Sequence, residues 1–130
     1  MESAQLKTAK VDATPRQELE ILRTELRKAM WNYVGIIRNE DSLSRMLQEM
    51  NRWETKVDAL NEQEFDARFC ELRNMVIVAR LITSAAQIRK ESRGTHYRAD
   101  YPLLDAQHQS HHICFRRQGK TTQISFAPSN

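Results

Sequence analysis

Apolar side chains recur at helical spacing in three separate stretches of this 130-residue chain. The first stretch opens with Thr14-Pro15-Arg16-Gln17, where threonine can cap a helix, proline fits the first helical position and glutamine can complete a capping box. This pattern predicts a helix over about 15 to 34, which Gly35 either interrupts or opens to the close approach of another helix. The apolar stripe of this helix is Leu19, Leu22, Leu26, Ala29, Met30 and Tyr33.

The second stretch begins near Asn39 or Asp41 and alternates one apolar face with one polar face. Such amphipathicity predicts a helix that places a single face in the core. A turn at 61–63 should end it. The apolar positions of this second helix are Leu43, Met46, Leu47, Met50, Trp53, Val57 and Leu60.

The third stretch predicts a helix from about Phe65 to about residue 93, with Gly94 as the left-handed residue that ends it. Its segment 75–88 is apolar almost all round, which is typical of a central, buried helix. The stripe that we expect in the core is Phe65, Phe69, Leu72, Val76, Ala79 and Ile82.

The chain ends differ from the middle. Residues 1–13 are polar and aperiodic, which is typical of a disordered tail or a linker stub. Three helices joined by short loops over 14–102 predict a mainly α fold, an antiparallel three-helix bundle.

In the C-terminal extension, 103–130, two β-prone runs flank Gln118-Gly119-Lys120 and favour a β-hairpin with a three-residue loop. An isolated hairpin is marginal in water, so we expect it to dock on the bundle or on a partner.

Composition excludes several functions. The 20 Lys and Arg residues against 17 Asp and Glu residues give a net charge of +3, less than nucleic-acid binders usually carry. No apolar run reaches the ~18 residues of a membrane helix. Two distant cysteines and no secretory signal favour a reduced, cytoplasmic protein. Glycines occur only at 35, 94 and 119, so we expect no cofactor-binding fingerprint for FAD or NAD in this chain.

Two clusters could carry chemistry, and both are weak candidates. Ser92 lies near His96 in sequence but has neither a strained elbow nor an orienting third group, which argues against a serine hydrolase. A soft divalent metal could bind the His/Cys cluster, but only two of its members would share one face of a strand, and zinc wants four ligands. We therefore expect no metal site and no catalytic residue. The cluster is His108, His111, His112 and Cys114, of which His112 and Cys114 would share a face.

The tryptophans, most methionines and one cysteine have a structural interpretation. At helical spacing they are more often core than a binding groove, and a cysteine on an amphipathic helix is more often a buried structural thiol. The residues concerned are Trp31, Trp53, Met30, Met46, Met50, Met75 and Cys70.

A densely charged segment, 89–102, follows the apolar helix and is the best candidate for a specified surface. Buried charge without a partner is expensive, so these groups must pair internally or meet a neighbour. One interpretation is a docking surface whose arginines bind carbonyls and carboxylates of another domain. The other is an internal network that pins the chain after the helix, and a direct catalytic role for His96 is a third. The docking candidates are Glu91, Arg93, His96, Arg98 and Asp100.

This segment also resembles a known motif. The residues Arg89, Glu91-Ser92-Arg93-Gly94, His96, Arg98 and Asp100-Tyr101-Pro102 resemble the closing motif of the C-terminal helical domain in the succinate dehydrogenase/fumarate reductase flavoprotein family. Residues 30–38 resemble the first helix of that domain in the L-aspartate oxidase branch, and 71–75 resemble the start of its last long helix. The three blocks keep the family's order over about 16–102. Residues 103–105 depart from the dehydrogenase branch, which leaves the C-terminal hairpin unassigned.

The resemblance implies a part of a larger enzyme. It implies the C-terminal helical domain of an FAD-dependent L-aspartate oxidase, which converts L-aspartate to iminoaspartate for NAD biosynthesis in the bacterial cytoplasm. The partner would be the flavin-binding domain, FAD would belong to the parent enzyme, and the chain alone would be inert. An exposed interface could also drive self-association. The alternative is a free-standing helical adaptor for protein contacts without a redox role.

Overall fold

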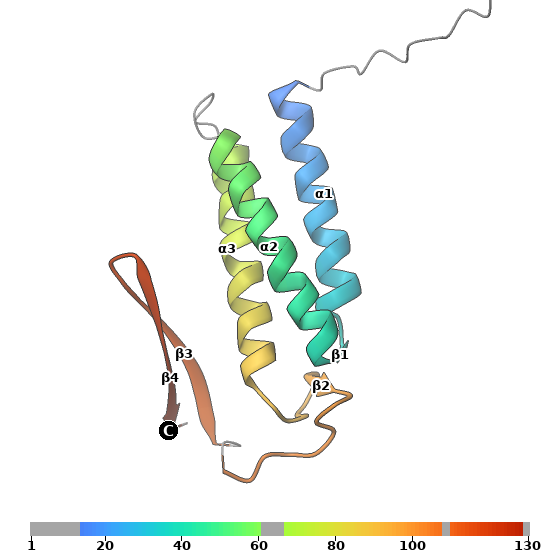
Figure 1. Cartoon of the computed structure of the whole chain (residues 1–130), viewed down its shortest axis with the longest axis vertical. Helices are drawn as coiled ribbons and strands as arrows, with labels where there is room; N and C mark the ends of the chain where they lie inside the picture. The colour runs from blue at the N-terminus through green and yellow to red at the C-terminus, as the bar shows by residue number, and fades with distance from the viewer. Residues whose placement is uncertain (1–13, 61–66, 108–109, 129–130) are drawn as a thin grey trace, which may run out of the picture.

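The computed structural model shows a bundle of three helices followed by a β-hairpin (Figure 1). It describes residues 14–60, 67–107 and 110–128. The helices run in alternating directions, so the prediction of a mainly α, antiparallel three-helix bundle is confirmed. The helices are α1 (Pro15–Val34), α2 (Glu40–Leu60) and α3 (Ala67–Ile88). The strands are β1 (Ile37–Arg38), β2 (Tyr97–Arg98), β3 (His111–Gln118) and β4 (Thr121–Pro128).

Local signals place the helix ends of α1 and α2. The predicted capping box is present, because the backbone N–H of Gln17 donates to Thr14 Oγ1 and the Thr14 N–H donates to Gln17 Oε1. At the other end of α1, a Cβ on Gly35 would lie 2.7 Å from the carbonyl oxygen of Trp31, so only glycine fits as the chain leaves the helix. Asn39 then caps α2 by accepting a 2.8 Å hydrogen bond from the Ser42 N–H.

The core lies where the apolar stripes of the three helices meet. The α2 stripe is buried as predicted except for Leu47 and Leu60, which are half-buried. Met30, Met75 and Cys70 pack at the margin of the core. The turn expected at 61–63 and the start expected at Phe65 lie outside the described residues. The buried apolar side chains are Leu22, Leu26, Val34, Leu43, Met46, Met50, Trp53, Val57, Phe69, Leu72, Val76, Ala79 and Ala86.

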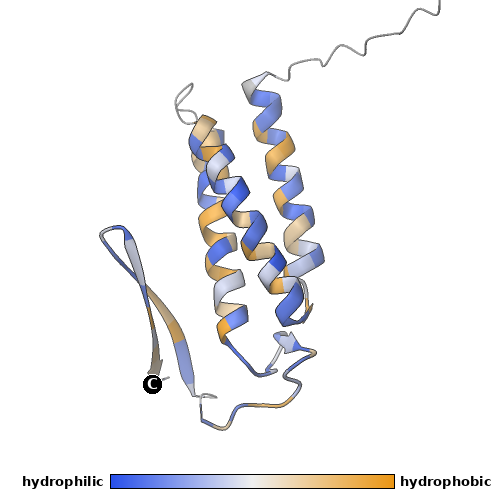
Figure 2. Cartoon of the chain, in the orientation of Figure 1, coloured by the Kyte–Doolittle hydropathy of each residue, from blue (hydrophilic) through white to orange (hydrophobic). Residues whose placement is uncertain are grey.

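Two predictions of burial were wrong. Trp31 is 79% exposed and lines an open groove between α1 and α3. Ile77, Val78, Leu81 and Ile82 on α3 are 37 to 52% exposed, although 75–88 was expected to be buried all round and Ile82 to lie in the core. Two neighbouring helices can cover only part of the circumference of a third. An apolar face of α3 is therefore open over residues 77–82, within a helix that carries many hydrophobic residues (Figure 2).

The third helix is shorter than predicted. It ends at Ile88, not near residue 93, because the guanidinium of Arg98 takes the carbonyls of Ala86 and Gln87 from the last turn. Gly94 is consequently not a helix cap. It adopts φ +54° in a tight turn that the paired backbone hydrogen bonds between Arg93 and His96 close.

The predicted hairpin is present, with a shorter loop than expected. Gln118 pairs with Thr121, so the loop has two residues, and Gly119 takes φ +59° at the first of them, where such turns prefer glycine. Its register places Ile113 opposite Phe126 and Phe115 opposite Ile124, so one face of the hairpin is apolar. The hairpin stands beside α3 (Figure 1), and Arg89 Nη2 donates a 2.8 Å hydrogen bond to the His111 carbonyl at its base.

Candidate functional site

The charged segment after α3 folds into a compact cluster at the end of the bundle that carries β1 and β2 (Figure 1). Arg98 is at its centre and is fully buried. All five guanidinium N–H groups have acceptors. These acceptors are Asp100 Oδ1 at 2.8 Å, Asp100 Oδ2 at 2.7 Å, Glu40 Oε2 at 3.1 Å and the carbonyls of Ala86 at 2.8 Å and Gln87 at 3.0 Å. Arg98 therefore acts as an internal staple between α2, α3 and the segment after it.

Asp100 extends the staple to the start of α2. Its Oδ2 accepts a 2.9 Å hydrogen bond from the Glu40 N–H, one of the donors that the first turn of a helix leaves without an intrahelical acceptor. The hydrogen bonds from Arg98 are the main reason that the pKa of Asp100 falls from 3.8 to about 2, and the Glu40 N–H adds to the effect. The same ion pair raises the pKa of Arg98. Both groups are thus charged at neutral pH.

Ser92 has a structural role as well. Its hydroxyl accepts a 2.8 Å hydrogen bond from the Arg98 N–H and lies 2.8 Å from the carbonyl oxygen of Tyr101. These backbone contacts fix the path of the chain around Arg98. Since the hydroxyl is engaged in this way, the arrangement does not support a nucleophile beside His96.

Glu91 forms a second buried staple. The residue is 1% exposed; its carboxylate pairs with Arg89, lies 3.7 Å from Arg93 Nη1 and accepts a 2.9 Å hydrogen bond from the Asp105 N–H. Burial alone would raise the pKa of Glu91, but the Asp105 N–H and the two guanidinium groups outweigh it, so the pKa lies below its ordinary value. Glu91 therefore anchors the chain that leads to the hairpin.

His96 and Arg38 form the part of the cluster that reaches solvent. Arg38 Nη1 lies 2.7 Å from His96 Nδ1, and His96 Nε2 lies 3.3 Å from the Arg89 carbonyl. Because Nδ1 must accept and Nε2 must donate, this imidazole is neutral. Its pKa is lowered, first by burial and then by the charges of Arg38, Arg98 and Arg89, while the hydrogen bond to the Arg89 carbonyl acts in the opposite direction.

Arg38 and Glu40 were not among the site residues predicted from the sequence. Arg38 Nε donates to the carbonyls of Val34 and Gly35, so it caps the end of α1, and β1 pairs in parallel with β2 beside it. The position of Arg38 at the end of the 30–38 block was the available signal. Glu40 had no such signal in the sequence, because its role depends on the guanidinium of Arg98, which is distant in the chain.

The five predicted docking residues thus divide into two groups. Arg98, Glu91 and Asp100 point into the internal network, which was the alternative interpretation of the segment. Arg93 and His96 are half-buried and line a cavity. The docking role itself stays a prediction. Among the described residues no group of three or more His, Cys, Asp or Glu side chains could hold a metal ion, and His108 lies outside those residues.

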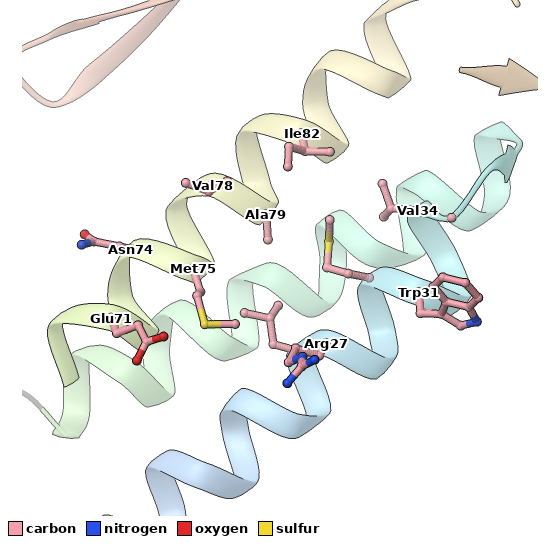
Figure 3. Close-up of a pocket in the computed structure, with 12 residues that line it drawn as sticks. Arg27, Trp31, Val34, Glu71, Asn74, Met75, Val78, Ala79 and Ile82 are labelled. Atoms are coloured by element: carbon pink, nitrogen blue, oxygen red, sulfur yellow. The ribbon is translucent and has the colours of Figure 1, made fainter. Parts of the chain in front are cut away.

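A groove between α1 and α3 continues from this cluster along the open face of α3 (Figure 3). Its volume is about 650 Å³ and its walls are mostly apolar. Trp31 and Val34 line it from α1, and Met75, Val78 and Ile82 line it from α3. Ile82 also lines the cavity that contains Arg93 and His96, so the two hollows are neighbours. Within the described part of the chain, no helix is long and apolar enough to cross a membrane.

Comparisons with known proteins identify relatives of this module. The family model described as fumarate reductase flavoprotein C-term matches residues 23–130. An uncharacterized FAD-dependent oxidoreductase of Methanocaldococcus jannaschii is 48% identical over 80 residues, which are 60% of this chain and 15% of that protein. An L-aspartate oxidase of Acinetobacter baylyi is 42% identical over 84 residues, which are 64% of this chain and 15% of that protein. The chain thus spans about 15% of the length of these curated relatives.

A solved structure has the same fold. The chain resembles Mycobacterium smegmatis Sdh1 in complex with UQ1 with a TM-score of 0.72 and 27% sequence identity. The likeness covers 90% of this chain and 22% of the Sdh1 chain. The bundle and the segment around it therefore have a counterpart within a much longer polypeptide.

Proposed function

Since the family model matches most of its length, this chain belongs to the fumarate reductase flavoprotein C-terminal family, and we propose that it is the helical module that packs against the flavin-binding domain of an FAD-dependent L-aspartate oxidase. The observation that carries the proposal is the open apolar face of α3. An apolar strip of this kind, continuous with a groove, marks a surface that another protein covers. The flavin-binding domain is the occupant that family membership favours.

The L-aspartate oxidase assignment rests on relatives and on sequence blocks. The Acinetobacter baylyi relative carries that name, and residues 30–38 resemble the same branch. In such an enzyme the chain would serve the oxidation of L-aspartate to iminoaspartate for NAD biosynthesis, in the cytoplasm. It would do so as a structural support, because the cluster around Arg98 is occupied by internal contacts and offers no nucleophile or general base in a reactive arrangement.

FAD does not fit the residues of this chain. A dinucleotide site needs a glycine-rich turn between a strand and a helix. Here Gly94 lies in the Arg93–His96 turn, Gly119 lies in the hairpin loop, and Gly35 follows a helix. None of the three precedes a helix directly after a strand, so FAD would be held by the flavin-binding domain.

Association with a separately produced flavin-binding domain tests this proposal. Ile82→Glu places a charge on the open face, and Ile21→Glu makes the same change at an isoleucine of α1 that does not line the groove. The two residues are similarly exposed, at 45% and 50%, so both variants should fold. We expect Ile82→Glu to weaken association by about tenfold or more, since burying a charge in an apolar interface is costly, and Ile21→Glu to leave it unchanged.

Recovered activity is the second readout. Mixing the two parts should restore hydrogen peroxide production from L-aspartate and oxygen, while this chain with L-aspartate and FAD should give none. If the wild-type chain does not bind the flavin-binding domain, the proposal is wrong. Self-association that Ile82→Glu abolishes would in that case favour the free-standing adaptor.

A further inference from the structure

A second cavity, next to the apolar groove, is lined by three arginines and three histidines, together with three aliphatic side chains. It has a volume of about 590 Å³, within the range of small-ligand sites. Arg38, Arg89, Arg93 and His96 line it, and Ala85 and Ala86 form a wall of small side chains that leaves room beside them. No aspartate or glutamate is among its described lining residues. The chemistry of the wall therefore suits a negatively charged occupant.

The charges around this cavity do not balance within the described residues. Arg89 and Arg93 share one carboxylate, Glu91, and it is much closer to Arg89. Arg38 has no carboxylate within ion-pair distance in the described part of the chain, although it is half-buried and burial lowers its pKa. Arginine cannot discharge at ordinary pH, so these guanidinium groups stay cationic. An anion between them would offset the free-energy cost of gathering like charges in a partly desolvated space.

Hydrogen-bond donors are available as well as charge. Arg38 uses Nε for the end of α1 and one Nη1 donor for His96, and no contact within the described structure engages its Nη2 group. The Arg93 guanidinium lies 3.7 Å from Glu91, beyond hydrogen-bond distance. Guanidinium forks of this kind match the two oxygens of a carboxylate or phosphate. Arg98, by contrast, has every donor engaged and faces the interior.

We propose that this cavity is a binding site for an oxyanion, a carboxylate or phosphate group held between Arg38 and Arg93. The site does not depend on the proposed docking to a flavin-binding domain. The oxyanion can be a free anion in solution or the carboxylate of an acidic side chain on a docked domain, because both present oxygen atoms to the same two guanidinium groups. His96, which already accepts from Arg38, holds that guanidinium at the cavity wall.

Titration of the whole chain with inorganic phosphate, at constant ionic strength and neutral pH, tests the site by NMR. We expect saturable shifts of the Arg38 Nε–H and of the Ala85 and Ala86 amides. Arg93→Gln should weaken the apparent affinity by about tenfold, because it removes one charge-assisted fork. Arg93 is half-exposed and is the more distant of the two guanidinium partners of Glu91, whose closer pair with Arg89 remains, so this variant should fold.

Arg52→Gln is the matched control. It removes the same charge from an exposed position on α2 that does not line the cavity, and its affinity should stay within about twofold of wild type. Phosphate should also raise the pKa of His96, since a nearby anion favours the imidazolium form. Shifts that do not saturate, or an equal loss in both variants, would show that only general charge attraction is present and would overturn the site.

Competition assigns the source of the oxyanion. If an isolated flavin-binding domain associates and displaces phosphate, the native group is one of its carboxylates; if both bind together, it is a free anion. Failure of that domain to associate leaves the phosphate titration interpretable. The proposed function and this inference can therefore fail separately.

Discussion

Replacing Asp100 with asparagine tests whether the Arg98 cluster holds the bundle together. The substitution keeps the size of the side chain and one acceptor oxygen for the Glu40 N–H, but it removes the charge that faces a fully buried guanidinium. Arg98 then keeps Glu40 and two carbonyls as acceptors. We expect a loss of stability without a loss of the fold.

The magnitude follows from the pKa of Asp100, which lies at about 2 in place of 3.8. At about 1.4 kcal/mol per pKa unit, the shift corresponds to ~2.4 kcal/mol of folding free energy. The Asp100 side chain is 29% exposed, and solvent screening reduces this to about 1.5–2 kcal/mol. In the variant the NH₂ of the amide faces the guanidinium, so one Arg98 N–H lacks a good acceptor, and this adds about 1 kcal/mol to the loss of stability. Asp100→Asn should therefore cost about 2.5–3 kcal/mol, roughly 8–12 °C in melting temperature.

Urea denaturation at several pH values measures this effect. The folded-state pKa of Asp100 is below its unfolded value, so its contribution is complete above pH 3.8 or so and is lost as the pH falls through about 2. Near pH 3 about half of this charge contribution is gone, so the gap between wild type and Asp100→Asn should shrink by about a third. Glu71→Gln, which removes a carboxylate from the exposed pair with Arg23, is the control and should cost less than about 1 kcal/mol. Equal costs for the two variants at neutral pH would refute the reasoning.

Two further predictions follow from burial and titration. The pKa of His96 is lowered by burial and by nearby arginines, so the unfolded chain takes up the proton first as the pH falls below about 6.5. Wild type should accordingly lose stability relative to His96→Gln on acidification from neutral pH, as urea denaturation would reveal; parallel profiles would contradict this. Trp53→Ala, which empties a buried core position, should cost about 3–5 kcal/mol, whereas Trp31→Ala should cost less than about 1 kcal/mol by thermal melting. A large cost at Trp31 would mean that this indole is covered in the isolated chain.

Local signals were sufficient for most of the fold. The capping box at Thr14 and the glycine at 35 act within a few residues of themselves, so the bounds of α1 could be predicted. The hairpin followed from β-prone runs around Gly119. The end of α3 could not be predicted, because it is decided by Arg98, which takes carbonyls of the last helical turn from a position further along the chain.

The candidate site was predicted in part, for a related reason. The charged segment was recognisable from its density of charges, but whether each group faces inward or outward depends on Glu40, which is distant in sequence. Arg98 and Glu91 turned out to be structural, and Arg38 joined the cavity wall only through the pairing of β1 with β2. The exposure of Ile82 also could not be predicted, because periodicity identifies an apolar face and does not say which protein covers it.

The engagement of every Arg98 donor has a consequence for association. Five hydrogen bonds already fix Arg98 and the backbone around it. A surface built on this region therefore loses little conformational entropy when a partner binds, and this favours a higher binding affinity. Arg98 joins the start of α2 to the end of α3, and Arg38, which contacts His96, caps the end of α1. These three helix ends should therefore move together as a preorganised platform and not adjust one by one.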